Sequence, residues 1–193
     1  MPVDLQSEYW TLSKWLAVQT DAACHSIVAC IDSYHPTRTE SSCNRLLKAH
    51  LRFYEAVTPI YSDTNLKRLF FSHLTEREVA SLERQLREEM DQVYTGDMAA
   101  KRVPNGLIPR IGWLYAAEFV ERGIIRLFAE TRPSYTGMKM DFEESAAVWK
   151  RFRNQLDGLD LSETDEECLA RSARSALISY SSLFDTAFKI AAN

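Results

Sequence analysis

The sequence is poor in the residues that make tight turns. It contains six glycines and six prolines among 193 residues, fewer than a β-sandwich or barrel with many short connections normally uses. No segment of useful length alternates apolar and polar residues with a period of two, as a half-buried strand does. These absences argue against a β architecture and predict an all-α protein.

Long apolar runs and strongly basic runs are missing as well. No apolar run approaches the roughly 20 residues that cross a bilayer, and the N-terminal MPVDLQSEYW lacks the apolar core of a signal peptide. No five consecutive residues are Lys or Arg, and the net charge is −4, whereas a phosphate-binding face usually makes a domain basic. We therefore expect a cytoplasmic protein with no membrane and no nucleic acid as partner.

The four cysteines are scattered, and no CxxC pair occurs among Cys24, Cys30, Cys43 and Cys168. This usage is typical of buried free thiols in a reducing compartment. The hydrophobic fraction of 46% supplies enough apolar mass for a core. At this length the sequence predicts a single domain spanning residues 1–193.

Apolar residues at helical spacing predict a bundle of about six helices. The expected segments are Leu5–Ser33, Thr39–Tyr61, Thr75–Tyr94, Ile111–Glu130, Asp141–Asp157, and a last helix from Thr164 nearly to the C-terminus. Thr-x-x-Glu patterns at Thr75 and Thr164 predict capping boxes. Pro59 is expected to kink or fray the last turn of its helix, and Thr95–Arg110 is the longest expected loop.

Two glycines, Gly112 and Gly123, lie inside the apolar helix expected at Ile111–Glu130. Glycine costs a helix interior about 1 kcal/mol relative to alanine. Such positions therefore indicate close backbone approach, either by another helix or by a flat ligand. In a helix bundle, a ligand site lies between facing helices.

Several segments together resemble the bacterial, biliverdin-producing heme oxygenases. Ile111-Gly-Trp-Leu-Tyr-Ala-Ala-Glu118 is similar to the distal helix of that family, and Thr20-Asp-Ala-Ala-Cys-His-Ser-Ile27 to its proximal helix. Leu47–Asp63 and Trp149–Leu161 also agree in order and spacing, and the likeness extends from Trp15 to Phe188. The resemblance implies the heme oxygenase fold, with heme held between two helices.

The proximal segment departs from the family at the iron ligand. The resemblance places a histidine four residues after Thr20, where this chain has Cys24, and His25 follows one residue later. A lysine that pairs with a heme propionate in the family corresponds to Ala17, although Lys14 lies one turn earlier. Tyr115 matches a tyrosine that contacts a propionate.

The distal segment departs too. Phe119 and Val120 stand where the family has a glycine and a serine that let the backbone lie over heme, and Arg122 replaces a leucine. Gly123 retains the later family glycine, but its neighbour is Ile124. The heme slot over this helix is therefore either filled, so that it holds no macrocycle, or reshaped for another ligand. The residues that would do so are Phe119, Val120, Ile124 and Ile125.

Helical periodicity separates the two candidate iron ligands. Cys24 shares a stripe with apolar residues, namely Ala17, Ile27, Val28 and Ile31, which predicts an inward face. His25 shares its stripe with Asp21 at i−4 and is expected at the edge of the site or in solvent. If heme binds, His25 or Cys24 would hold the metal, and Cys24 is otherwise an inert buried thiol. A thiolate ligand would redirect the chemistry of bound heme.

A di-iron centre is a further possibility on this fold, with Glu118 as one candidate ligand. However, His50 and Glu55 are five residues apart and do not share a helix face, and no Glu-x-x-His pair completes the set.

Two hypotheses about function follow. In the first, the protein is a heme oxygenase homologue with altered or lost turnover, a pseudoenzyme that binds heme, another small molecule or a protein partner. In the second, it is an active oxidoreductase that cleaves heme to biliverdin, iron and CO with O₂ and an external electron donor, as the resemblance implies. The positions that match family heme contacts are Cys24, Tyr115, Phe119 and Gly123, with His25 adjacent.

Overall fold

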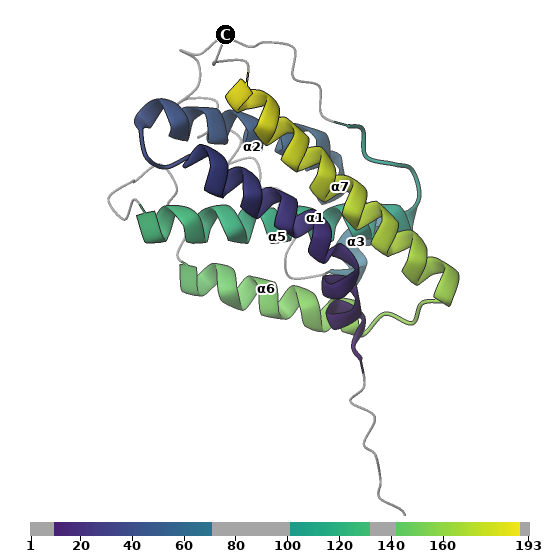
Figure 1. The fold of residues 1–193 in the computed structure, drawn as a ribbon. Helices are drawn as coiled ribbons and strands as arrows, with labels where there is room; N and C mark the ends of the chain where they lie inside the picture. Colours follow the sequence, from purple (N-terminus) through teal and green to yellow (C-terminus); the bar gives the residue numbers. More distant parts are fainter. Residues whose placement is uncertain (1–9, 71–100, 132–141, 190–193) are drawn as a thin grey trace, which may run out of the picture.

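The computed structural model describes residues 10–70, 101–131 and 142–189, and within these ranges every regular element is an α-helix. The helices are α1 (Leu12–Tyr34), α2 (Glu40–Tyr61), α3 (Thr64–Leu69), α5 (Leu107–Thr131), α6 (Phe142–Asp157) and α7 (Glu163–Lys189) (Figure 1). The all-α prediction is confirmed for this part of the chain. The helix expected at 75–94 lies outside the described residues.

Two helices, α1 and α5, begin several residues from the expected positions. Helix α1 starts at Leu12 rather than Leu5, because Thr11 is its N-cap and accepts the backbone N–H of Lys14 at 3.4 Å. Helix α5 starts at Leu107, inside the expected loop, with Pro109 in its first turn. Proline is tolerated there because a first-turn N–H has no partner within the helix.

The predictions about the end of α2 and the cap of α7 were not confirmed. Helix α2 continues through Pro59 to Tyr61, so the expected fraying is wrong. The cap of α7 is Ser162, whose hydroxyl accepts the N–H of Asp165 at 3.2 Å, and the capping box at Thr164 is therefore wrong. Helix α3 was not expected, although Asp63 caps it by accepting the N–H groups of the second and third helical residues.

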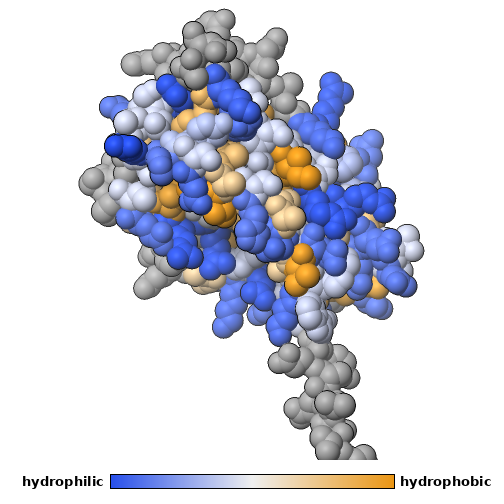
Figure 2. Space-filling model, viewed as in Figure 1, coloured by the Kyte–Doolittle hydropathy of each residue, from blue (hydrophilic) through white to orange (hydrophobic). Residues whose placement is uncertain are grey.

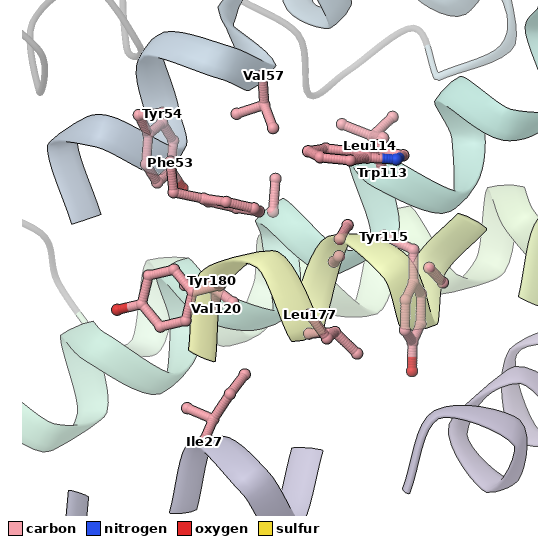
Figure 3. Close-up of a cluster of buried hydrophobic side chains, with 14 of the residues drawn as sticks. Ile27, Phe53, Tyr54, Val57, Trp113, Leu114, Tyr115, Val120, Leu177 and Tyr180 are labelled. Atoms are coloured by element: carbon pink, nitrogen blue, oxygen red, sulfur yellow. The ribbon is translucent and has the colours of Figure 1, made fainter. Parts of the chain in front are cut away.

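Helix α7 is the centre of the packing and contacts α1, α2 and α5. The core between these helices contains an aromatic cluster, in which Phe53 of α2 stacks on Trp113 of α5 with ring centroids 6.1 Å apart (Figure 3). Tyr180 of α7 meets Phe53 edge-on at 5.3 Å. These three aromatic side chains are fully buried and are among the largest side chains of the described core.

Gly112 explains how α5 can approach α7 so closely. A Cβ atom at this position would lie 2.5 Å from the carbonyl oxygen of Leu169 and 2.8 Å from the backbone nitrogen of Ala173. Of the two readings offered for the interior glycines, close helix packing is the correct one at Gly112. The glycine thus fixes α5 against the central helix.

Apolar side chains also reach the surface, including Val18, Val28 and Ile178, which are each at least 50% exposed. Figure 2 shows that the apolar surface on this face is divided into small patches by polar side chains. None of the described helices is both long and apolar enough to cross a membrane.

Candidate ligand-binding site

We call the seam between helices α1 and α5 the groove, because a hollow lies between the two helices at each of its ends. Both helices pack against α7, but they make few contacts with one another, and they run in the same direction (Figure 1). At the N-terminal end of α1 the groove deepens into a cavity of about 430 Å³, closed on one side by α6. Its lining residues are Trp10, Ser13, Lys14, Ala17, Val18, Tyr115, Phe119, Arg122, Trp149 and Arg153.

Aromatic rings form one wall of this cavity, which we call the α1–α5–α6 cavity. Trp149 of α6 lies 5.6 Å from the ring of Tyr115 and meets the ring of Phe119 edge-on at 6.4 Å. The guanidinium carbon of Arg122 lies 5.9 Å from the centre of the Trp149 ring, in a cation–π contact. The Phe119 ring therefore contributes to the wall next to Trp149, and it is only half-buried.

A second arginine enters the cavity from α6 and is positioned by α1. The Nε–H of Arg153 donates to the hydroxyl of Ser13 at 3.3 Å. The same hydroxyl donates to Asp157 at 3.0 Å, and the backbone N–H of Ser13 donates to that carboxylate at 2.7 Å. Asp157 thus satisfies the first turn of α1, while the guanidinium of Arg153 stays at the cavity wall.

Tyr115, Thr20 and Cys24 meet where α5 faces α1. The hydroxyl of Tyr115 points away from the stack of Phe53 and Trp113 (Figure 3). Burial raises the pKa of Tyr115, while a hydrogen bond with Thr20 opposes this rise. Burial also raises the pKa of the Cys24 thiol, with an opposing hydrogen bond from Thr20. Both groups are therefore neutral at pH 7.

His25 lies on the outer side of α1, as its periodicity predicted. Its side chain is 72% exposed, and Nδ1 lies 3.0 Å from the carbonyl oxygen of Asp21 and 3.2 Å from the carboxylate of the same residue. Cys24 is half-buried against the core. The predicted order of the two residues is therefore confirmed, whereas their role in binding a metal stays a prediction.

The stripe predicted to face inward with Cys24 is only partly covered. Ile27 is buried, but Val28 is 50% exposed and Ala17 is also exposed. Ala17 lines the α1–α5–α6 cavity, and the described part of the fold buries neither residue, so their predicted burial is wrong.

Gly123 behaves differently from Gly112. A Cβ atom at Gly123 would meet no heavy atom of the described residues within 4 Å, and the residue is exposed. Close helix packing therefore does not explain this glycine. It leaves open space one turn beyond Phe119 on the same helix.

The remaining distal residues are part of the core. Val120, Ile124 and Ile125 are each at most 3% exposed, so they pack the bundle behind the groove. Glu118 accepts a hydrogen bond from the hydroxyl of Tyr61 at 3.2 Å. No group of three His, Cys, Asp or Glu residues that could hold a metal occurs in the described ranges, and the di-iron alternative has no support there.

Sequence reasoning singled out half of the ten lining residues, namely Lys14, Ala17, Tyr115, Phe119 and Arg122. Arg122 was noticed as a departure from the family pattern, and an arginine on so apolar a helix is a usable signal. Arg153, Trp149 and Trp10 gave no comparable signal, because their meeting with α1 and α5 depends on where α6 docks.

A smaller hollow of about 370 Å³ lies at the other end of the groove, near the C-terminal ends of α1 and α5. Its lining includes Ile31, His35, Arg38 and Leu127. Along the two helices, Cys24 of α1 and Gly123 of α5 fall between the residues that line the two hollows.

Comparison with known proteins gives relatives over almost the whole chain. The chain is 24% identical to heme oxygenase PigA of Pseudomonas aeruginosa over 183 residues, which cover 91% of this chain and 92% of the relative. It superimposes on the NO- and CO-bound heme oxygenase from Neisseria meningitidis with a TM-score of 0.77 and 24% identity, covering 93% of this chain and 92% of that one. No family model matches the sequence. The fold and the relationship expected from the resemblance are thus confirmed: this chain is a distant relative of the bacterial heme oxygenases and has their all-α fold.

Proposed function

We propose that this protein is a heme oxygenase homologue that no longer carries out ordinary heme turnover, and that it binds a small flat ligand in the groove between α1 and α5. Its role would then be binding, regulation or interaction rather than cleavage of heme. The observation that carries the proposal is the position of His25, the only histidine near the proximal position in sequence.

His25 does not present a nitrogen to the groove. Nδ1 is engaged by the carbonyl oxygen of Asp21 one turn earlier, and most of the side chain is in solvent. Moving this ring to the groove side would require α1 to rotate by about 100°, the angle between consecutive helical residues. Such a rotation would expose Leu16, Thr20 and Ile27, which are now buried.

Cys24 is the residue that lies nearer the groove, and its chemistry is unfavourable for an iron ligand of this family. Burial raises the pKa of its thiol, so the thiolate that binds metals is scarce at neutral pH. A thiolate on heme iron would also favour a different chemistry from that of a neutral ligand. The residues present therefore do not fit a heme held by histidine, and no catalytic step follows from them.

The space for a ligand nevertheless remains. The α1–α5–α6 cavity of about 430 Å³ falls within the range of small-molecule sites, and Gly123 keeps the middle of α5 free of a side chain. The separate apolar patches in Figure 2 offer a protein partner no extended apolar face on this side. These features favour a small molecule over a protein as the occupant.

Titration of the purified protein with hemin, followed by visible absorption, tests the proposal. We expect no sharp Soret band that depends on His25, so wild type and His25→Ala should give matching spectra. Addition of reductant under O₂ should yield no biliverdin. A one-to-one Soret band that disappears in His25→Ala, together with formation of biliverdin, would overturn the proposal.

The second candidate function is active heme oxygenation, and the open space at Gly123 is the observation that favours it. Because Phe119 lies beside Trp149, its ring leaves this stretch of α5 uncovered. The hemin experiment separates the two candidates, since only the active enzyme converts hemin to biliverdin.

A further inference from the structure

One face of α1 stays uncovered along most of the helix, although the composition of α1 is that of a buried helix. Helix α1 is as apolar as α5, which packs into the core, and its apolar residues are not confined to one side. A helix that is apolar on all sides is normally covered on all sides. We call the uncovered side, opposite the core, the outer face of α1. Its residues, all exposed, are Lys14, Val18, Asp21, His25, Val28 and Asp32.

The spacing along the outer face is that of a helix–helix contact. Its residues follow one another at intervals of four, three, four, three and four. With this spacing one helix presents a continuous row of side chains to a second helix, as in a coiled coil. Ala17, Ala22 and Ala29 flank the row and are exposed as well. Such small side chains let a second helix approach closely, so the outer face suits one more helix.

The order of residues along the outer face is complementary to itself when it is reversed. If two α1 helices pack antiparallel about a two-fold axis at Ala23, residues equally distant from Ala23 face one another. Lys14 then faces Asp32 of the second copy, since each lies nine positions from Ala23. In the same way Val18 faces Val28, and Asp21 faces His25. A parallel pair would instead bring each of these charged groups against its own counterpart.

The charged groups of the outer face can form these pairs. Among the described residues, neither Lys14 nor Asp32 has an ion-pair partner. The printed contacts of His25 to Asp21 of its own helix are both made by Nδ1, which leaves Nε2 for Asp21 of a second copy. Exposed charge pairs add little affinity each, but they select the orientation in which opposite charges meet. Here they select the antiparallel pair.

Helix α7 adds an apolar residue beside the middle of this face. Ile178 is 55% exposed, and on α7 it lies between Arg174, which contacts Gln19 of α1, and Ser181, which contacts Cys30. Helices α1 and α7 lie side by side on the face that Figure 2 shows, where polar side chains divide the apolar patches. A partner must therefore match apolar and charged groups in the same order. A second copy of the chain does so.

We propose that the outer face of α1 is the interface of a homodimer, in which the α1 helices of two copies pack antiparallel about a two-fold axis at Ala23. The same surface is used by both copies, as such symmetry requires. The dimer goes beyond the proposed function, because it forms whether or not the groove is occupied. The 23 residues of α1 span about 34 Å. One helix pair of this length is a small interface, so we expect a dissociation constant of about 10–100 µM.

Sedimentation equilibrium of the full chain tests the interface. Wild type should show a monomer–dimer equilibrium between about 5 µM and about 1 mM, a range that brackets the expected constant. Lys14→Glu should weaken the dimer by about tenfold or more, because it sets like charges against Asp32 at both ends of the contact. Lys14→Glu combined with Asp32→Lys exchanges the two charges and should restore the affinity of wild type.

Two further variants separate the contact from general effects of charge. Lys150→Glu is the matched control, because Lys150 is an exposed lysine of α6 and the net charge changes by the same amount. It should dimerise like wild type. Val28→Asp should dissociate the dimer, because it buries a carboxylate against Val18 of the second copy. Val28 is 50% exposed in the single chain, so circular dichroism should show an unchanged helix content.

Several outcomes would overturn the inference. One is a monomer at every concentration, and another is a dimer that Lys14→Glu leaves unchanged, since that dimer would use a different surface. A charge exchange that fails to restore association would exclude the antiparallel pair. An equal loss in Lys150→Glu would attribute the effect to net charge and would overturn the inference as well. The proposed function is judged separately, by the hemin spectra and by biliverdin formation.

Discussion

Asp157, the last residue of α6, accepts both the backbone N–H and the hydroxyl of Ser13 in the first turn of α1, at 2.7 and 3.0 Å. The two residues are 144 positions apart in the sequence. A carboxylate at this place satisfies a free donor at the start of the helix and complements the positive end of its dipole. The contact joins α1 to α6 at the edge of the α1–α5–α6 cavity.

Replacing Asp157 by alanine should therefore destabilise the protein. We expect the free energy of unfolding to fall by about 1–3 kcal/mol, because the buried Ser13 would lose the carboxylate that accepts its hydrogen bonds. Urea unfolding followed by circular dichroism measures the change. Asp160→Ala is the control, since Asp160 is exposed, and a loss of equal size there would contradict the role given to Asp157.

The two interior glycines of α5 should respond to alanine in opposite directions. At Gly112 the new methyl group would overlap the backbone of α7, so we expect Gly112→Ala to cost at least about 2 kcal/mol of stability despite the better helix propensity. At Gly123 the methyl group meets open space, and Gly123→Ala should stabilise by about 0.5–1 kcal/mol. Thermal unfolding of the pair tests this difference. Similar values for both variants would mean that α5 and α7 do not cross as described.

His50 should make stability fall as the pH is lowered. The side chain is fully buried, neither ring nitrogen has a hydrogen-bond partner among the residues that the structure describes, and burial lowers its pKa from 6.5 to about 3. Between these values the unfolded chain binds a proton that the folded protein excludes, so stability is retained above pH 6.5 and decreases below it. From pH 6.5 to pH 5 this single group should remove about 2 kcal/mol.

The variant His50→Leu removes that contribution. Its free energy of unfolding should depend less on pH between 6.5 and 5 than that of wild type, because leucine has no proton to bind. Ile27→Val is the control, because it changes the buried core without removing a titratable group; it should lower the free energy of unfolding by a similar amount at every pH. Parallel curves for wild type and His50→Leu would show that His50 is protonated as easily in the folded state as in the unfolded one.

Restoring the family residues at the groove should restore iron ligation. In Cys24→His with Phe119→Gly, an imidazole replaces the half-buried thiol, and the ring beside Trp149 is removed from the cavity wall. We expect this double variant to give a one-to-one Soret band with hemin that wild type lacks. Phe119→Gly with Cys24 retained is the control and should give no such band. If the double variant also fails, the groove is too narrow for heme, and residues other than these two close it.

The short-range features of this chain follow from the sequence alone. Helical segments and the order of Cys24 and His25 around α1 are set by a spacing of 3.6 residues, which each helix carries within itself. The cap of α2 is local as well, because the side chain of Thr39 lies directly before the first helical residue, Glu40. The cap expected at Thr164 failed because Ser162, two residues earlier, offers a competing polar cap, and helix ends of this kind shift by one or two residues.

Tertiary structure decided which helix faces are covered. Gly112 and Gly123 both lie inside the same apolar helix, yet Gly112 packs against the backbone of α7, whereas a Cβ at Gly123 would meet no described atom within 4 Å. Val28 and Ala17 follow the apolar stripe of Cys24, but the helices that the structure describes leave both residues exposed. The cavity likewise exists because α6 brings Trp149 and Arg153 to α1 and α5. The position of a residue within its helix fixes the direction in which its side chain points. The atoms that the side chain meets in that direction belong to helices that are distant in the sequence, so only the tertiary structure decides them.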